Sequence, residues 1–497
     1  MQQLQDYIQH ANLLAGAVAL SFMLLLYLVW LSGIALLPLV VFVVPLALYG
    51  YWQTFVKPWL WVALIAVGSF LGNIMHLLPE GVIPLTLFQL FLFTAVFSIL
   101  LRRLIERDFN FRMMGFEAEI ILFLGLIFLS LIWAPDAPDG FRDGVRVLIS
   151  IFFLYLVFNE VKRTHEIKMV LIALVVVAVF LGAYGVYQNV TNVGDTVRNM
   201  LGGGRFLRGR VTGTTTDPNR FATMFFIPMA FTACIILSKK QLSHKVMAFV
   251  AFMVMSGGII VTYSRSAWIG AILMLLIIAW YYRNVKLFAY LGLVVIAVLI
   301  AFPQFTFTLL NAAQRFLDIT AGSADDSSRI RLLLGLAAIG MFLDSWFIGV
   351  GFRGFVESFT NYYSLHESIG VAEPHNVLYT VMAELGLIGI VLYGFIMFKI
   401  FRVAWLNIRL TETEDEKIIA LTCFSTIVAF FVFYQFYGGG LNDNNFWLVC
   451  ALAFSLYYVG KAKSTPDPDE LPPAPSLTPS GGGTPSRETG LPSNPTA

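Results

Sequence analysis

Residues 373–394 read EPHNVLYTVMAELGLIGIVLYG, a polar opening followed by an apolar run about as long as a bilayer is thick. A transmembrane helix needs roughly 20 predominantly apolar residues, and the chain repeats such runs along much of its length. Hydrophobic residues make up 58% of the chain and charged residues 12%, and the mean hydropathy is +0.78. A soluble fold cannot bury that much apolar surface. The sequence therefore predicts an all-α polytopic integral membrane protein.

Apolar runs with the length of a membrane span recur along the chain, and they predict about 12–14 transmembrane helices. The run at 145–158 is the least secure because it is short. The candidate spans are 13–31, 34–50, 59–78, 82–101, 116–133, 145–158, 169–187, 217–237, 246–263, 267–282, 287–303, 375–400, 418–437 and 444–459.

Three parts of the chain are distinguished by composition. Residues 1–187 are expected to form N-terminal transmembrane helices. Residues 188–460 are expected to form a transmembrane core that includes a large, partly helical outer loop at 304–374. Residues 461–497 are rich in Pro, Gly and Ser and too polar to pack against a core, which predicts a disordered cytoplasmic tail.

Basic residues predict the topology, because connections rich in Lys and Arg stay cytoplasmic. Such connections all fall on one side if both termini are cytoplasmic; they are 102–112, 161–168, 238–245, 283–286 and 399–417. Two long segments, 188–216 and 304–374, then face outward. The second contains a helical pattern that predicts an amphipathic helix lying on the bilayer, with Ser327 or Ser328 as its N-cap.

With this topology all eleven lysines lie inside, whereas the twelve basic residues outside are all arginine. One explanation is that lysine is simply used up by the topology signal. The chemical explanation is that a guanidinium binds phosphate through two parallel hydrogen bonds and keeps its charge, which suits a phosphorylated lipid headgroup. The outward arginines are Arg142, Arg146, Arg198, Arg205, Arg208, Arg210, Arg220, Arg265, Arg315, Arg329, Arg331 and Arg353.

Two short stretches concentrate this chemistry. In GGGRFLRGRVTGTTTDPNRFA (202–222), Asp217 and Pro218 start a helix, so Asn219 and Arg220 lie in a first turn that favours anions. The stretch lacks the Gly-Lys-Ser/Thr ending of a nucleotide-binding loop, and a flexible loop with a cap would also explain it. In TYSRSAWIG (262–270), Arg265 occupies a tight turn at the membrane boundary, where it either serves function or extends toward lipid headgroups.

The opening stretch supplies a candidate base. Pro374 is expected to begin the helix, with His375 and Asn376 in its first turn. A histidine with a pKa near 6.5 can accept a proton at neutral pH, although a histidine bonded to a carbonyl would be purely structural. Glu384 should lie about 13 Å deeper on the opposite helix face, so it is expected to serve a polar network beside Gly386 rather than a dyad with His375.

Four features occur in order: the Asp-Pro-Asn-Arg helix start, the Ser-Arg turn, the Arg-rich outer loop with GVGFRGF, and PHNVLYTVMAELGLIG. Together they resemble the O-antigen ligase and polymerase superfamily of bacterial envelope enzymes, over roughly residues 200–400. The resemblance implies an inverting glycosyl transfer at the periplasmic face of the bacterial inner membrane, without a cofactor. A glycan on undecaprenyl diphosphate would be the donor, and a sugar hydroxyl of lipid A-core the acceptor.

The resemblance also implies roles for individual residues. His375 would be the general base, and Arg265 and Arg331, or Arg329 in the alternative register, would hold the diphosphate. Weaker substrate-binding candidates complete the predicted site: Arg210, Asn219, Arg220, Arg353, Asn376 and Glu384.

Departure of a diphosphate needs a positive partner. The Asp-x-Asp motif that often holds a metal for this purpose occurs only at 467–469, in the tail, so the site is expected to contain no metal and to use arginines instead. Cys234, Cys423 and Cys450 lie in apolar runs without metal-like spacing and are expected to pack in the core. Membrane lipids are expected partners, and nucleic acid is not.

Three alternatives remain open from sequence. A polymerase would use a second lipid-linked glycan as acceptor. A flippase for lipid-linked sugars would share the span count but should bury more central charge. A non-catalytic scaffold would give no reason for His-Asn at a helix start.

Overall fold

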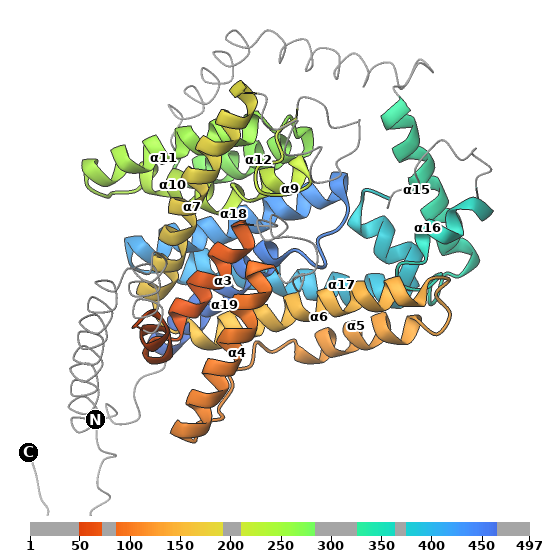
Figure 1. The fold of residues 1–497 in the computed structure, drawn as a ribbon, viewed down its shortest axis with the longest axis horizontal. Coiled ribbons are helices and arrows are strands. Elements are labelled where there is room, and N and C mark those ends of the chain that lie inside the picture. The colour runs from red at the N-terminus through yellow and green to blue at the C-terminus, as the bar shows by residue number, and fades with distance from the viewer. Residues whose placement is uncertain (1–48, 72–85, 192–209, 284–325, 363–373, 465–497) are drawn as a thin grey trace, which may run out of the picture.

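A computed structural model of the protein describes residues 49–71, 86–191, 210–283, 326–362 and 374–464 (Figure 1). Its regular elements within these ranges are all helical, which confirms the predicted all-α class. They are α3 (Trp59–Leu71), α4 (Leu87–Glu106), α5 (Glu117–Ser130), α6 (Ala137–Glu160), α7 (Thr164–Thr191), α9 (Pro218–Thr223), α10 (Phe226–Leu237), α11 (Leu242–Ile260), α12 (Arg265–Tyr281), α15 (Asp326–Asp344), α16 (Phe355–Ser358), the 3-10 turn η3 (Phe359–Asn361), α17 (Val377–Leu410), α18 (Glu414–Tyr437) and α19 (Asn444–Ser464).

Among the described residues, six segments are long and apolar enough to cross a membrane. They are α4, α7, α9 with α10, α11, α17 and α18. A seventh is added if the short helix Tyr49–Val56 and α3, bent by 118° relative to each other, form one span. The predicted runs at 13–31 and 287–303, and most of that at 34–50, lie outside the described residues. The total of about 12–14 spans therefore stays a prediction.

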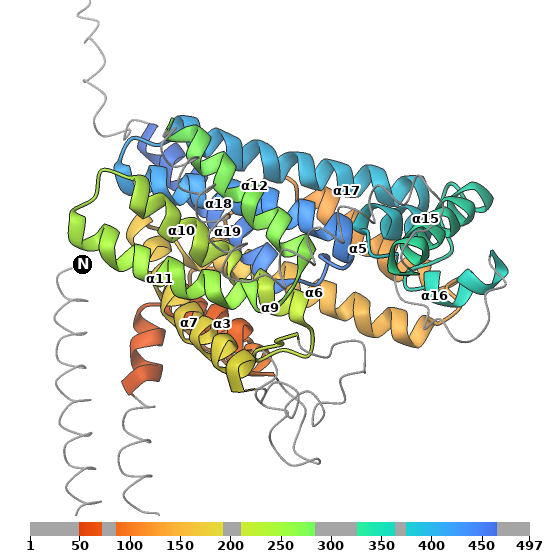
Figure 2. The same cartoon turned by 90° about the horizontal axis from the view of Figure 1, so that it is seen from above.

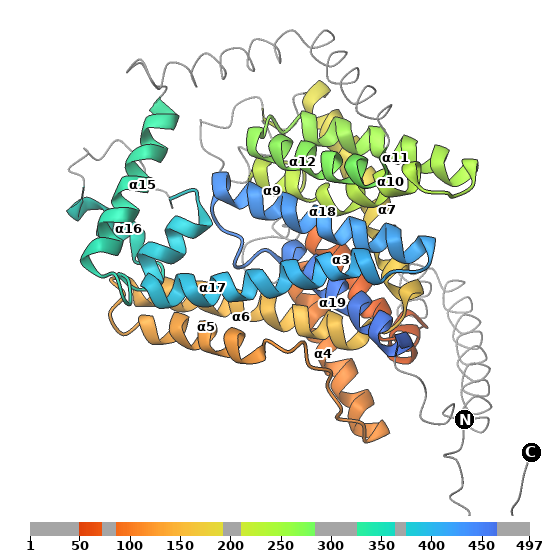
Figure 3. The same cartoon turned by 180° about the vertical axis from the view of Figure 1, so that it is seen from behind.

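The helices form one bundle around α17, α18 and α19 (Figure 3). Helix α18 packs against α10, α12 and α17, while α19 packs against α6 and α17. Helix α11 lies against α7 and α10. The core between these helices is apolar and rich in phenylalanine. All three cysteines are buried in it and free, as expected for packing residues.

One end of the bundle is fastened by lysines. Asp415, at the start of α18, accepts ion pairs from Lys168 at 3.0 Å and from Lys240 at 2.7 Å. Glu416 pairs with Lys463 at the end of α19. The first turns of α7, which carry Lys168, and the connection before α11, which carries Lys240, therefore meet the start of α18 at one end of the bundle. Because α18 has 24 residues, its far end at Tyr437 lies about 35 Å away.

The described part of the outer loop, 326–362, folds against that far end (Figure 2). Helix α15 packs against α17 and shares a small apolar cluster with α16 and η3. The loop also reaches the α5–α6 connection, where Trp133 Nε1 donates to Gly349 O at 3.2 Å and Phe352 N donates to Ser130 Oγ at 3.0 Å. The partly helical outer loop is thereby confirmed for these residues. The structure describes this helix from Asp326 on, and Ser327 and Ser328 lie within it, so neither is its N-cap, contrary to expectation.

Helix α17 covers most of the predicted run at 375–400, and it breaks at Gly386, whose φ of 63° and ψ of −158° are not helical. The outer-loop backbone at 346–351 lies beside this break. A Cβ at Gly386 would come within 2.6 Å of that backbone, so only glycine fits. Four backbone hydrogen bonds join the two segments: Val350 N to Ala383 O, Gly351 N to Glu384 O, Leu387 N to Trp346 O and Ile388 N to Phe347 O, at 2.9, 2.9, 2.8 and 3.4 Å.

Helix α6 is longer than the apolar run at 145–158 predicted, because its polar first turns are also helical. Asp136 caps it by accepting from Asp139 N at 3.1 Å, and Pro138 fits the first turn. The additional turns carry Asp143 beyond the apolar run toward the outer loop.

Close helix contact depends on small residues at the crossing of α7 and α11. A Cβ at Gly258 would come within 2.7 Å of the Cα of Gly182 and of the Phe225 ring. Such close backbone approach is how helices associate in a membrane.

We therefore predict that Gly258→Ala lowers the apparent melting temperature of the purified protein, because overpacking costs about 1–3 kcal/mol. The matched control is Gly125→Ala, at an exposed position of α5 where a Cβ would meet nothing within 4 Å. That control should be neutral or slightly stabilising, by up to about 1 kcal/mol. Equal melting temperatures for the two variants would contradict the close packing of α7 on α11.

Candidate functional site

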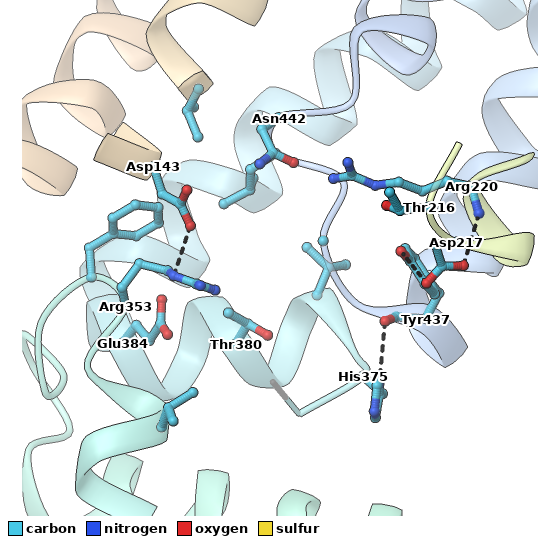
Figure 4. A pocket seen from close by; sticks show the side chains of 16 residues that line it. Asp143, Thr216, Asp217, Arg220, Arg353, His375, Thr380, Glu384, Tyr437 and Asn442 are labelled. Carbon is cyan, nitrogen blue, oxygen red and sulfur yellow. Dashed lines mark hydrogen bonds and ion pairs between the residues drawn. The ribbon is translucent and has the colours of Figure 1, made fainter. Parts of the chain in front are cut away.

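A cavity of about 610 Å³ opens at the end of the bundle opposite the lysines (Figure 4). Segments far apart in the sequence build it: α6, the start of α9, the loop before α16, the start of α17, and the connection between α18 and α19. Its size lies within the range of about 300–1,000 Å³ common for small-molecule sites. The lining residues are Asp143, Val147, Thr216, Asp217, Arg220, Phe352, Arg353, Val356, His375, Val377, Thr380, Glu384, Tyr437, Gly439, Leu441 and Asn442.

His375 lines this cavity in an unusual backbone conformation. Its φ is 53°, in the left-handed region that few non-glycine residues adopt. It precedes α17, which begins at Val377, so the expectation that it lies in the first helical turn was wrong. Its Nδ1 lies 3.1 Å from Tyr437 O. A carbonyl only accepts, so Nδ1 must carry the proton, and Nε2 of the neutral ring is then free to accept one.

The sequence left open a purely structural role for His375, in which the ring bonds to a carbonyl, and such a bond, to Tyr437 O, is present. It is compatible with base chemistry because it uses Nδ1 and fixes the tautomer. Room for His375 is provided by Gly438, where a Cβ would come within 3.1 Å of the His375 Cα and where φ is 79°.

Asn376 holds the start of α17 in place. Its Oδ1 accepts from Leu378 N at 2.9 Å and from Tyr379 N at 3.1 Å, so it is the N-cap rather than a first-turn residue. Its Nδ2 donates to Gln435 O at 3.1 Å. Both functional groups of this side chain are therefore used to join α17 to α18, and Asn376 positions the neighbouring His375.

Asp217 forms another wall of the cavity and caps α9, as predicted. Its Oδ1 accepts from Asn219 N at 2.5 Å and from Arg220 N at 3.3 Å. Its Oδ2 accepts from the Tyr437 hydroxyl at 3.3 Å, so Tyr437 bonds to Asp217 through its side chain and to His375 through its carbonyl. The side chain of Arg220 extends from α9 toward Asn442 (Figure 4).

Arg353 enters the cavity from the outer loop. Its Nε pairs with Asp143 Oδ2 at 2.8 Å, and Arg146 pairs with the other oxygen of the same carboxylate at 2.6 Å. Figure 4 shows Arg353 between Asp143 and Glu384. Glu384 is buried, at 3% exposure, and lines the same cavity as His375. His375 lies before the helix, so its distance from Glu384 does not follow from helical geometry, and the expected absence of a dyad stays a prediction.

Arg210 and Asn219 form a second group beside the cavity. Arg210 Nε donates to Thr262 O at 3.0 Å, and another of its nitrogens donates to Asn219 Oδ1 at 3.1 Å. Ser264, the N-cap of α12, donates to the same Asn219 oxygen at 2.8 Å. These bonds tie the Arg-rich segment before α9 to the Ser-Arg turn, which places Arg265 nearby.

Arg210, Arg265 and Arg331 lie close enough to affect one another, and we call them the arginine group. Desolvation lowers the pKa of Arg210; Asp217 opposes this, and Arg265 and Arg331 add to it. Desolvation and the nearby Arg265 also lower the pKa of Arg331. Adjacent like charges disfavour one another, so an anion bound among these three guanidiniums would relieve their repulsion.

The structure thus brings the predicted residues into two neighbouring sets. Arg220, Arg353, His375 and Glu384 line the cavity; Arg210, Asn219, Arg265 and Arg331 do not line it but lie next to it. The side chain of Arg329 lies outside the described residues. Among the described residues, no three His, Cys, Asp or Glu side chains gather as metal ligands.

Sequence reasoning missed Asp143, Tyr437 and Asn442 as cavity residues. For Asn442 a signal existed in GGGLNDNN (438–445), where three glycines and four polar residues interrupt two apolar runs. Such a stretch needs both unusual backbone conformations and polar partners within a membrane protein.

The bundle and its cavity define a multi-pass α-helical membrane protein with a polar site at one end. The model of the O-antigen ligase family matches residues 250–394, from α11 through the first part of α17. Among curated proteins, the chain is similar to the teichuronic acid biosynthesis protein TuaE of Bacillus subtilis (strain 168). The two are 25% identical over 384 residues, which cover 73% of this chain and 77% of TuaE. These matches confirm the family resemblance and support an O-antigen ligase- or polymerase-like membrane glycosyltransferase.

The geometry at Tyr437 predicts that neutral His375 carries its proton on Nδ1. ¹⁵N NMR of histidine-labelled protein in nanodiscs should show this tautomer. The chain has six histidines, so the spectrum of His375→Asn would identify the signal by difference. A neutral ring protonated on Nε2 would contradict the hydrogen bond to Tyr437 O.

Proposed function

We propose that the protein transfers a glycan from undecaprenyl diphosphate to a sugar hydroxyl, by a single inverting displacement that needs no metal. The acceptor is lipid A-core, as for an O-antigen ligase, and the alternative acceptor is a second lipid-linked glycan, as for a polymerase. The observation that carries the proposal is the position of His375, with Nε2 available, in a polar cavity beside three arginines.

The reaction assigns one task to each set of residues. His375 Nε2 accepts the proton of the acceptor hydroxyl as its oxygen attacks the anomeric carbon of the donor sugar. The bond from that carbon to the diphosphate breaks, and its electron pair leaves on the phosphate oxygen. Arg265, Arg331 and Arg210 bind the diphosphate and stabilise the charge that develops on it. The imidazolium then releases its proton to solvent.

Arg220 lies between the two sets, because it follows Asn219 of the second group and its side chain enters the cavity. It is suited to bridge the diphosphate and the reacting sugar. Asn219 and Asn376 act through their neighbours: Asn219 orients Arg210, and Asn376 holds the start of α17 next to His375.

The distribution of basic residues supports the orientation that we propose. The lysines gather at the end away from the cavity, and lysine-rich connections remain in the cytoplasm. Both termini would then be cytoplasmic and the cavity would face the periplasm, in the inner membrane. Such a site is open to lipid-linked glycans in the outer leaflet.

Removing the proposed base should stop transfer. Both His375→Ala and His375→Asn should lose about 10²–10⁴ in turnover with purified donor and acceptor. Asn is the sharper test, because it tolerates a positive φ and can still donate to Tyr437 O, yet it is no base at neutral pH. Melting temperature and membrane insertion should match the wild type. Turnover at the wild-type rate in either variant would remove His375 from the mechanism.

The role of the arginine group can be tested separately, because a lysine keeps the positive charge but lacks the planar guanidinium that binds phosphate through two hydrogen bonds. Arg265→Lys should therefore be strongly impaired in turnover. The matched control is Arg142→Lys, at an exposed position where Arg142 pairs with Asp139 outside the cavity. That control should keep full activity, and a fully active Arg265→Lys would reduce Arg265 to a membrane-boundary residue.

A further inference from the structure

We infer that the cavity is a subsite for an uncharged, hydroxyl-rich sugar unit, read by Asn442 and Asp143, while the diphosphate is held outside it by the arginine group. This inference rests on the proposed function and deepens it, by dividing the ligand between two neighbouring places of different charge.

Residues 438–445, which form the connection between α18 and α19 and the first residues of α19, carry four polar side chains, and three of them fix this segment. Asp443 accepts from the Tyr434 hydroxyl at 2.7 Å. Asn444 accepts from Ser150 of α6 at 2.9 Å, and Asn445 accepts from Ser69 of α3 at 2.9 Å. Three different helices therefore hold this connection, so the backbone that presents its fourth polar residue is rigid.

That fourth residue is Asn442, and its side chain lines the cavity. Its amide has no hydrogen-bond partner among the described residues. An amide offers two donors and one acceptor oxygen, the combination that pairs with sugar hydroxyls, which both donate and accept. Figure 4 shows Asn442 between Asp143 and Arg220.

The charge of the lining argues against an anionic occupant. Asp143, Asp217 and Glu384 contribute three carboxylates, against the two guanidiniums of Arg220 and Arg353. Arg146 pairs with Asp143 from outside the lining and brings the described charges into balance. These described charges give a diphosphate or a uronate little net attraction, whereas the lining offers many hydrogen-bonding atoms to hydroxyls.

The arginine group has the opposite character. Arg210 donates to Thr262 O and to Asn219 Oδ1, and Ser264 donates to the same Asn219 oxygen, so Arg210 is held beside Arg265 at the start of α12. The diphosphate therefore has a better partner next to the cavity than within it. Phe352 and Tyr437 add aromatic surface to the cavity lining, on which the apolar face of a sugar ring can pack.

Two substitutions that conserve shape should move the selectivity in opposite directions. Asp143→Asn removes a negative charge from the cavity, and Asn442→Asp adds one. Protein in lipid nanodiscs, which avoids detergents with sugar headgroups, would be applied to an array of neutral oligosaccharides and their uronate counterparts. The wild type should prefer the neutral set. Asp143→Asn should raise the ratio of uronate to neutral binding about fivefold, and Asn442→Asp should lower it.

Two further variants separate contact from folding. Asn442→Ala should weaken neutral-glycan binding about fivefold through its lost hydrogen bonds. Asn361→Ala, at an exposed position of η3 outside the cavity, should not change it. The transfer reaction has one KM for the donor and one for the acceptor. If Asn442→Ala raises the donor KM, the bound sugar unit belongs to the donor, and if it raises the acceptor KM, the unit belongs to the acceptor.

The inference would be overturned if the wild type bound no glycan or preferred uronates. It would also be overturned if neither Asp143→Asn nor Asn442→Asp changed the ratio of uronate to neutral binding. These outcomes are distinct from failure of the proposed function. If selectivity follows the charge while His375→Ala still transfers glycan, the subsite stands and the proposed mechanism falls. If His375→Ala is inactive but selectivity ignores the charge, the mechanism stands without this subsite.

Discussion

The candidate site depends on the break in α17 at Gly386. Backbone that leaves a helix inside a membrane protein must find other hydrogen-bond partners, and here the outer-loop segment at 346–351 supplies them. Gly349 and Gly386 make this possible, because a Cβ on either would come within 2.6 Å of the facing backbone. The loop is thereby fixed to α17 two residues after Glu384. Arg353, just beyond 346–351, enters the cavity from that fixed position, which is how two segments distant in sequence share one site.

A second constraint is the division of charge between the two ends of the bundle. At one end Asp415 and Glu416 gather lysines from three other parts of the chain. At the other end the cations are arginines. Arg353 pairs with a carboxylate in the cavity, whereas the arginine group lies beside the cavity and its like charges repel one another. The charges of the first arrangement pair with one another. The arginine end retains attraction for an anion. It lies next to His375, whose Nδ1 bonds to Tyr437 O and thereby leaves Nε2 able to accept a proton.

Much of this could be predicted from the sequence where the signal is local. Apolar run lengths predicted the helical class, Asp217-Pro218 predicted the start of α9, and the Ser-Arg turn was predicted between two apolar runs, the second of which forms α12 from Arg265 on. What escaped prediction needs tertiary contacts. Nothing local in 373–394 shows that His375 adopts a positive φ or that α17 breaks at Gly386, since both depend on α18 and the outer loop. Asp143 was missed because its part of α6 is polar, although Asp136 and Pro138 extend the helix through it.

The most direct measurement is the reaction itself, in nanodiscs containing purified protein and a labelled glycan on undecaprenyl diphosphate, with a chelator present throughout. The account predicts free undecaprenyl diphosphate only when an acceptor is added, with the glycan on that acceptor and its anomeric configuration inverted. Transfer to lipid A-core would mark a ligase, and transfer to a second lipid-linked glycan a polymerase. A donor that stays intact with every acceptor, or that crosses a sealed bilayer unchanged, would contradict glycosyl transfer at this site.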